Sequence, residues 1–267
     1  PNRPSHRSRQ EHRRSAACYK RVTAMARFDG RAFDALRPIE MLVHFHRPSE
    51  GSVLYRAGGT VVLCTASVDD RVPPFLEGKG QGWLTAEYQM HPRANPRRQE
   101  RDGRGKAPSG RTQEIQRLVG RALRAAVDMS KLGSRTITID CDVLEADGGT
   151  RTASITGGFV ALALALAKLG VRALREPIAA TSTGHIEGGI ALDLCYVEDS
   201  TARVDLNVVA TKSARIVEVQ GTAEGEPIER QEVDAMVDLA LAGIAKLVVI
   251  QEQALARAGV DIARLKA

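Results

Sequence analysis

The sequence predicts a mixed α/β fold of the α+β kind, in which β-sheets are covered by α-helices. Two patterns predict this class. Runs rich in β-branched residues recur along the chain, and each group of such runs is followed by a segment with helical periodicity. Composition is the third observation, because 43% hydrophobic and 26% charged residues are ordinary values for a globular protein. We therefore expect a folded protein rather than a disordered chain.

The first predicted elements are four β-strands. Val53–Ala57 and Thr60–Val68 are separated by Gly58-Gly59, a pair typical of the tight turn of a β-hairpin. Met41–His46 and Trp83–Met90 are also rich in residues that strands favour. These runs form the first set of predicted strands.

A loop and a helix are predicted next. Residues 91–111 are rich in arginine, glycine and proline, which predicts a long exposed loop, and such loops are usually functional or disordered. Thr112–Met129 is predicted to be a helix that Thr112 caps, with Glu114 suited to the helix dipole. The apolar residues of this segment recur with the helical period: Ile115, Leu118, Val119, Ala122, Leu123 and Ala126.

The centre of the chain predicts a strand, a turn and a buried helix. Thr136–Leu144 alternates between apolar and polar residues, and Asp147-Gly148-Gly149 predicts a turn. Thr150–Lys168 has almost no polar face, so we expect this helix inside the protein. The longest apolar run, Phe159–Ala167, is about half the ~18 residues that a membrane span needs, so no membrane partner is expected.

The last third of the chain predicts a second set of strands and a C-terminal helix from Glu229 to Ala256. Four strands are expected, at Ile178–Ile186, Ile190–Val197, Arg203–Ala210 and Ile216–Thr222.

The formal net charge of +6 is concentrated at the N-terminus. Residues 1–24 hold seven Lys/Arg and one acidic residue, so we expect a basic disordered extension before a single domain at 25–267. A transit peptide or a nucleic-acid-binding arm has such a composition, and translation that starts at Met25 would remove it. Residues 91–124 hold ten Lys/Arg and three acidic residues, and a polyanion would dock there.

The four cysteines do not form a recognisable metal or disulfide pattern. Cys18, Cys64, Cys141 and Cys195 lie far apart and lack the spacing of a zinc site. Their spacing favours a reducing, cytoplasmic setting.

The turn before the buried helix is a candidate anion site. The first amides of a helix have no intrahelical partner and lie at the positive end of its dipole. Gly149, Thr150 and Arg151 could therefore hold a phosphate, with the arginine adding a forked cation. A plain turn with a helix cap explains these residues equally well. The Gly-Lys-Ser/Thr of a Walker A loop does not follow the turn.

Arg111 and two aspartates complete the candidate residues. Arg111 lies just before a predicted helix, where it would add a second cation. Considered without the other residues, it is more simply interpreted as an ordinary exposed arginine. Asp199 and Asp205 are expected on a turn and an adjacent strand. Two such carboxylates suit Mg²⁺, which prefers oxygen ligands, and a solvent-facing acidic pair is the alternative.

Long segments of this chain also match a known family. They are Asp29–Arg31, Leu36–Pro38, Val61–Pro74, Gly82–Tyr88, Gly110–Arg124, Ile139–Gly157, Val197–Ser200, Val204–Val209 and Val219–Glu226. Through these segments the chain from about Arg27 to about Ala256 resembles the ribonuclease PH family. Its bacterial members are phosphate-dependent exoribonucleases that trim tRNA 3′ ends.

The resemblance implies a fold, an assembly and a set of site residues. The implied fold is that of domain 2 of ribosomal protein S5, and the implied assembly is a homo-oligomer, a hexamer built as a trimer of dimers. The implied catalytic residues are Arg111, Asp199 and Asp205, and the two aspartates would also bind Mg²⁺. The implied phosphate-binding residues are Arg111, Gly149, Thr150 and Arg151. Arginines of the basic loop are expected to contact RNA: Arg93, Arg97, Arg98 and Arg101.

The expected function is therefore phosphorolytic 3′→5′ trimming of precursor tRNA, and of rRNA by extension. The enzyme would consume inorganic phosphate, release nucleoside 5′-diphosphates and catalyse the reverse nucleotidyl transfer. Two alternatives are a non-catalytic RNA-binding ring subunit of an exosome-like assembly, and a nucleotide-binding phosphotransferase that uses the glycine turn. Dependence on inorganic phosphate in the presence of RNA distinguishes the three.

Overall fold

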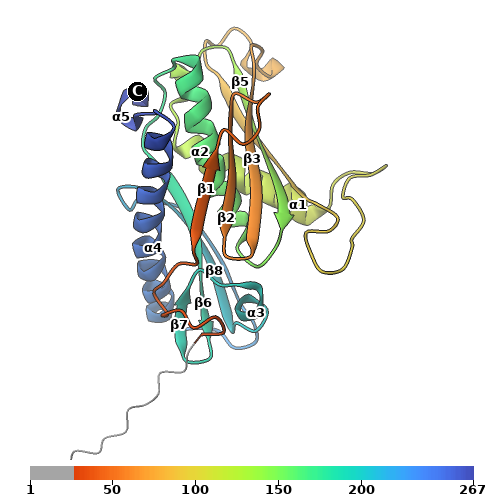
Figure 1. The fold of residues 1–267 in the computed structure, drawn as a ribbon, viewed down its shortest axis with the longest axis vertical. Helices are drawn as coiled ribbons and strands as arrows, with labels where there is room; N and C mark the ends of the chain where they lie inside the picture. The colour runs from red at the N-terminus through yellow and green to blue at the C-terminus, as the bar shows by residue number, and fades with distance from the viewer. Residues whose placement is uncertain (1–26) are drawn as a thin grey trace, which may run out of the picture.

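The computed structural model describes residues 27–267, so the expected extension at 1–24 lies outside the described residues. Two β-sheets and the helices packed against them make up the fold (Figure 1). The α-helices are α1 (Gly110–Ala125), α2 (Thr150–Leu169), α3 (Tyr196–Asp199), α4 (Arg230–Arg257) and α5 (Ile262–Leu265). Two 3₁₀ turns lie at Pro74–Leu76 and Met129–Lys131.

The first sheet has five strands in the order β1-β2-β3-β5-β4. They are β1 (Ile39–Val43), β2 (Gly51–Ala57), β3 (Thr60–Asp69), β4 (Trp83–Met90) and β5 (Thr136–Glu145). β4 pairs in parallel with β5, and the other neighbours are antiparallel. The predicted hairpin is confirmed, because Ala57 pairs with Thr60 across the Gly58-Gly59 turn.

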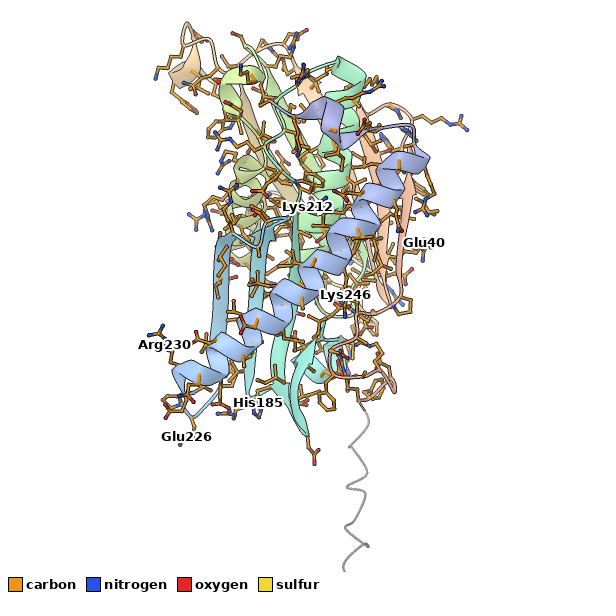
Figure 2. The ribbon with its side chains drawn as sticks, turned by 90° about the vertical axis from the view of Figure 1, so that its left-hand side faces the viewer. Glu40, His185, Lys212, Glu226, Arg230 and Lys246 are labelled. Atoms are coloured by element: carbon orange, nitrogen blue, oxygen red, sulfur yellow. The ribbon has the colours of Figure 1, made fainter. Side chains whose placement is uncertain are left out.

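The second sheet has four antiparallel strands in the order β7-β6-β8-β9. They are β6 (Ile178–Ile186), β7 (Gly189–Leu192), β8 (Val204–Thr211) and β9 (Ile216–Ala223). Helix α4 packs against β6 and β8 and crosses the face of this sheet (Figure 2).

Helix α2 forms the centre of the core, as its composition predicts. It packs against β2 and β3 of the first sheet and against β6 of the second. It approaches the first sheet so closely that a Cβ on Gly51 would lie 2.1 Å from the carbonyl oxygen of Ala161. Its length and composition would allow it to cross a membrane, but 83% of its most apolar window is buried inside the protein. It is therefore placed as a core helix.

Three predicted elements end well before their predicted last residue, each for a local reason. Helix α1 ends at Ala125 rather than Met129, because Val127 forms an antiparallel bridge with Leu174: the amide of Asp128 donates to the carbonyl of Ala173, and the amide of Arg175 donates to the carbonyl of Ala126. β1 ends at Val43 rather than His46, since His44 has a φ of 56°.

The third wrong boundary changes the site. The strand predicted at Ile190–Val197 ends at Leu192, because Asp193 adopts a φ of 55° and pairs with Arg37 at 2.7 Å. The following residues form the short helix α3, which carries Asp199. Asp199 thus lies on a helix and not on the predicted turn.

Candidate active site

One cavity of about 1110 Å³ collects the candidate residues predicted from the sequence. The residues that line it include Arg111, Gly149, Thr150, Arg151, Asp199 and Asp205. They come from the start of α1, the start of α2, the end of α3 and strand β8. Of the arginines expected to contact RNA, Arg101 lines the cavity. The exposed Arg93, Arg97 and Arg98 lie on the same loop, which projects from the side of the molecule (Figure 1).

The turn before α2 presents uncapped amides to this cavity. Gly148 and Gly149 have φ values of 74° and 64°, a conformation that glycine adopts without steric cost. Among the described residues no side chain caps the helix, so its first amides keep their hydrogen-bonding capacity. These free donors, at the positive end of a 20-residue helix, form a candidate anion site.

Buried side chains from distant segments fix the turn. Arg37 donates to the carbonyl of Asp147 at 2.6 Å and pairs with Asp193 at 2.7 Å. The hydroxyl of Thr60 donates to the carbonyl of Gly148 at 2.7 Å. Burial lowers the pKa of Arg37, but the Asp193 carboxylate more than offsets that effect, so the pKa is raised and the guanidinium stays charged. The conformation of the anion site is therefore set before any ligand binds.

Arg151 is held by an acidic partner on α1. Its Nη2 donates to Glu114 at 2.9 Å, and the amide of Gln220 on β9 donates to the other Glu114 oxygen at 3.1 Å. The Nε of Arg151 is buried without a hydrogen-bond partner among residues 27–267. The guanidinium is thus oriented by Glu114 at the cavity that Arg151 lines, while its Nε is shielded from solvent.

The hydroxyl of Thr150 is also positioned. Tyr88 is 2% exposed, and its hydroxyl lies 2.9 Å from the hydroxyl of Thr150. Burial raises the pKa of Tyr88, so the phenol stays protonated at neutral pH and can donate to Thr150.

Asp102 anchors the basic loop to the start of α1. Its carboxylate accepts hydrogen bonds from Ser109 and, at 2.6 Å, from the hydroxyl of Thr112. These bonds lower the pKa of Asp102. The predicted cap was wrong, because Ser109 caps α1 and the hydroxyl of Thr112 is engaged by Asp102. Arg111, in the first turn of α1, is exposed to the cavity.

The two aspartates share a repulsive environment. Desolvation and then the charge of Asp205 raise the pKa of Asp199. Desolvation also raises the pKa of Asp205, and the charge of Arg151 partly opposes that shift. Arg111 and Arg151 act on Asp199 through charge and not through a hydrogen bond. The carboxylate oxygens therefore stay available to a cation.

A buried ion pair holds α3 in place. Arg27 donates to both oxygens of Glu198, at 2.8 and 2.6 Å, and Glu198 also accepts from the amide of Cys195 at 3.1 Å. These bonds lower the pKa of Glu198 against the opposing effect of burial. Since Glu198 precedes Asp199, this pair fixes the position of the first aspartate.

Sequence reasoning missed the residues that support the site. Arg37 lies in one of the matching segments, but its partner Asp193 is 156 residues away, so neither spacing nor periodicity could reveal the pair. Glu114 was assigned to the helix dipole instead of to Arg151. Two arginines of α1 are engaged within the chain, since Arg121 pairs with Glu218 at 2.7 Å and Arg124 lies over the ring of Trp83.

Comparisons with known proteins agree with this architecture. The sequence profile described as "3′ exoribonuclease family, domain 1" matches residues 35–168, and that described as domain 2 matches residues 176–243. A crystal structure of rice (Oryza sativa) Rrp46 has a TM-score of 0.69 at 16% identity, covering 85% of this chain and 99% of that chain.

Two archaeal assemblies also contain similar chains. One is an Archaeoglobus fulgidus exosome with RNA bound to the active site, with a TM-score of 0.70 at 21% identity, covering 84% of this chain and 91% of that chain. The other is an archaeal exosome core, with a TM-score of 0.67 at 21% identity, covering 86% and 91%. At these identities the similarity shows the fold, and the expected mixed α/β class is confirmed.

Proposed function

Because the chain belongs to the RNase PH family of 3′ exoribonucleases, we propose that it shortens RNA from the 3′ end by phosphorolysis. The observation that supports this proposal is the cavity in which Arg111, the Gly149–Arg151 turn and the Asp199–Asp205 pair meet. We further propose the bacterial type of substrate, the 3′ ends of precursor tRNA and by extension of rRNA.

The chain's own groups account for phosphate binding. The free amides at the start of α2 would donate to the anion, the Thr150 hydroxyl adds a donor, and the guanidinium of Arg151 adds a charged group at the cavity. Arg111 lies at the same cavity and can bind the phosphodiester of the RNA. Arg151 would hold inorganic phosphate and Arg111 the phosphodiester of the RNA, so that the two anions come together despite their mutual repulsion.

In the proposed reaction an oxygen of inorganic phosphate attacks the phosphorus of the last phosphodiester. The bond between that phosphorus and the 3′-oxygen breaks, and the leaving oxygen takes the proton that the phosphate gives up. The terminal nucleotide is released as a nucleoside 5′-diphosphate. Arg111 and Arg151 offset the charge that develops, the means by which phosphoryl-transfer enzymes chiefly act.

Asp199 and Asp205 fit a magnesium ion. They offer hard oxygen donors that no described arginine binds directly, and the charge of Asp205, which raises the pKa of Asp199, would favour a cation near the two carboxylates. Within the described part of the chain no group of three acidic, His or Cys side chains is placed to hold a metal, although Glu224 also lines the cavity and its charge raises the pKa of Asp205. Two carboxylates suit an ion that keeps several waters. Magnesium held there would stabilise charge on the leaving oxygen.

The setting of this activity is also a proposal. Exposed arginines of the loop before α1 would guide the RNA backbone into the cavity. The exosome chains of similar fold support assembly as a ring, for which we propose a homohexamer. We place the protein in the cytoplasm, where its three described cysteines would remain reduced.

The test is a trimming assay. A tRNA with extra 3′ nucleotides is incubated with the protein and Mg²⁺, with and without inorganic phosphate, and the released nucleotide is identified. The proposal predicts nucleoside diphosphates that appear only with phosphate. Monophosphates released without phosphate would mean hydrolysis. RNA that is bound but never shortened would favour the non-catalytic ring subunit.

A further inference from the structure

Tyr196, the first residue of α3, is an aromatic residue with no role in the proposed reaction. It is 63% exposed, more than every large hydrophobic residue described except Phe28. Leaving so much aromatic surface in water forfeits the stabilisation that burial would give.

The surroundings of Tyr196 show where this surface is available. It lines the cavity together with Gly148, Gly149 and Asp199. Tyr88 lines the cavity too, but it is 2% exposed and its hydroxyl is bonded to Thr150. Among the described Phe, Trp and Tyr residues, Tyr196 alone presents an exposed ring to the cavity.

The backbone that carries Tyr196 is fixed. Its amide donates to the carboxylate of Asp147 at 3.1 Å, and a Cβ on Gly148 would lie 2.9 Å from the same amide nitrogen. The remainder of α3 is held by the buried pair of Arg27 and Glu198. The ring therefore stands beside the anion site on a support that does not need to be ordered by a ligand.

We propose that Tyr196 stacks on a nucleobase that flanks the scissile phosphodiester, an inference that rests on the proposed function. A nucleic acid entering this cavity brings bases whose flat faces match an exposed ring, and stacking of this kind tolerates any base. A protein partner is the less favoured occupant, because the ring lies in the cavity wall beside Asp199. The neighbouring Val197 is also exposed, at 45%, but does not line the cavity.

The test is a binding cycle that removes either the ring or the base. Affinity for a short single-stranded RNA is measured by fluorescence anisotropy without phosphate or Mg²⁺, so that no turnover occurs. Tyr196→Ala is expected to weaken binding by about 5- to 150-fold, the range measured for one stacked base. Tyr196→Phe should bind like the parent protein, because stacking needs the ring and not the hydroxyl. Val197→Ala is the matched control and should also be unchanged.

The second arm uses RNAs that are abasic at the last or at the penultimate nucleotide. If the ring stacks on one of these bases, Tyr196→Ala should have no effect with the RNA that lacks that base. An equal loss with all three RNAs would overturn the proposal, and so would a change of oligomeric state in Tyr196→Ala. Since the cycle measures binding alone, it can succeed even if phosphate-dependent release fails, so the two proposals are tested separately.

Discussion

Arg151 and Glu114 set the electrostatics of the site at the scale of single residues. Glu114 orients the guanidinium by one charge-assisted bond of 2.9 Å, and Gln220 in turn holds Glu114. The negative charge of a carboxylate so close to an anion site repels phosphate, so charge alone does not explain why Glu114 lies there. We therefore interpret Glu114 as a positioning residue that keeps Arg151 in a fixed rotamer.

Replacing Glu114 tests this interpretation. Glu114→Ala should raise the KM for phosphate by about 10- to 150-fold, the effect of losing one hydrogen bond to a charged group. Glu114→Gln keeps a hydrogen-bonding oxygen and should restore most of the affinity. Initial rates at varied phosphate and saturating RNA measure both values. A KM that is unchanged in Glu114→Ala would show that Arg151 is oriented by other contacts.

Arg111 is one of the cations that the structure leaves exposed at the cavity. Arg111→Ala should lower the rate of phosphorolysis by about 10²–10³-fold, as expected when one donor that stabilises the transition state is lost. Arg117→Ala, on the same helix but away from the cavity lining, is the matched control and should keep full activity. Intact phosphorolysis in Arg111→Ala would exclude this arginine from catalysis.

Replacing Asp199 by asparagine should have opposite effects on activity and on stability. The pKa of Asp199 is raised above its ordinary value of 3.8. The folded state therefore binds this proton more tightly than the unfolded chain, and stability falls as the pH rises through that window. In EDTA, Asp199→Asn should thus melt at a higher temperature than the parent at pH 7, with the difference vanishing below about pH 4. In the presence of Mg²⁺, the Asp199→Asn variant should have lost nearly all phosphorolytic activity. A variant that is less stable at pH 7 would contradict the raised pKa.

At the scale of elements, the start of α2 is defined by backbone geometry. Its left-handed glycines place the uncapped amides at the cavity, and Arg37, Thr60 and the Leu194 carbonyl surround the turn. The anion site therefore depends on close packing that a side chain at the turn would disrupt.

Gly148→Ala tests this packing. The added Cβ would lie 2.7 Å from the carbonyl oxygen of Leu194, so the turn must shift. We expect a loss in unfolding free energy greater than the ~1–2 kcal/mol cost of a left-handed residue, together with a raised KM for phosphate. Gly170→Ala shares the positive φ but meets nothing within 4 Å, and should show only the backbone cost. Urea unfolding compares the two, and equal losses would contradict the account.

Local patterns predicted the elements well because the signals lie within each element. The alternation in β5 and the apolar length of α2 are visible in ten to twenty consecutive residues. α3 was missed, since it has four residues and its start depends on the left-handed Asp193, which a distant arginine stabilises. The Ser109 cap was missed for a similar reason. The hydroxyl of Thr112 donates to Asp102, a contact that the sequence pattern does not reveal.

At the scale of the molecule, the cavity is built from segments far apart in the chain. Helix α1, on the side of the first sheet, contributes Arg111. The central helix α2 contributes the anion site, and strand β8 of the second sheet contributes Asp205. The candidate residues themselves could be proposed from glycine, arginine and aspartate chemistry. Their supports could not, because pairs such as Arg27 with Glu198 span 171 residues and leave no pattern in the sequence.

The most direct measurement follows the phosphate. The protein is incubated with RNA, Mg²⁺ and radiolabelled inorganic phosphate, and the released nucleotides are separated. The account predicts that the label appears in the β-phosphate of nucleoside diphosphates, and that the label is lost when Arg151 is replaced by alanine. Shortened RNA with unlabelled monophosphates would contradict the account, because the anion site at Gly149–Arg151 would then not hold the attacking group.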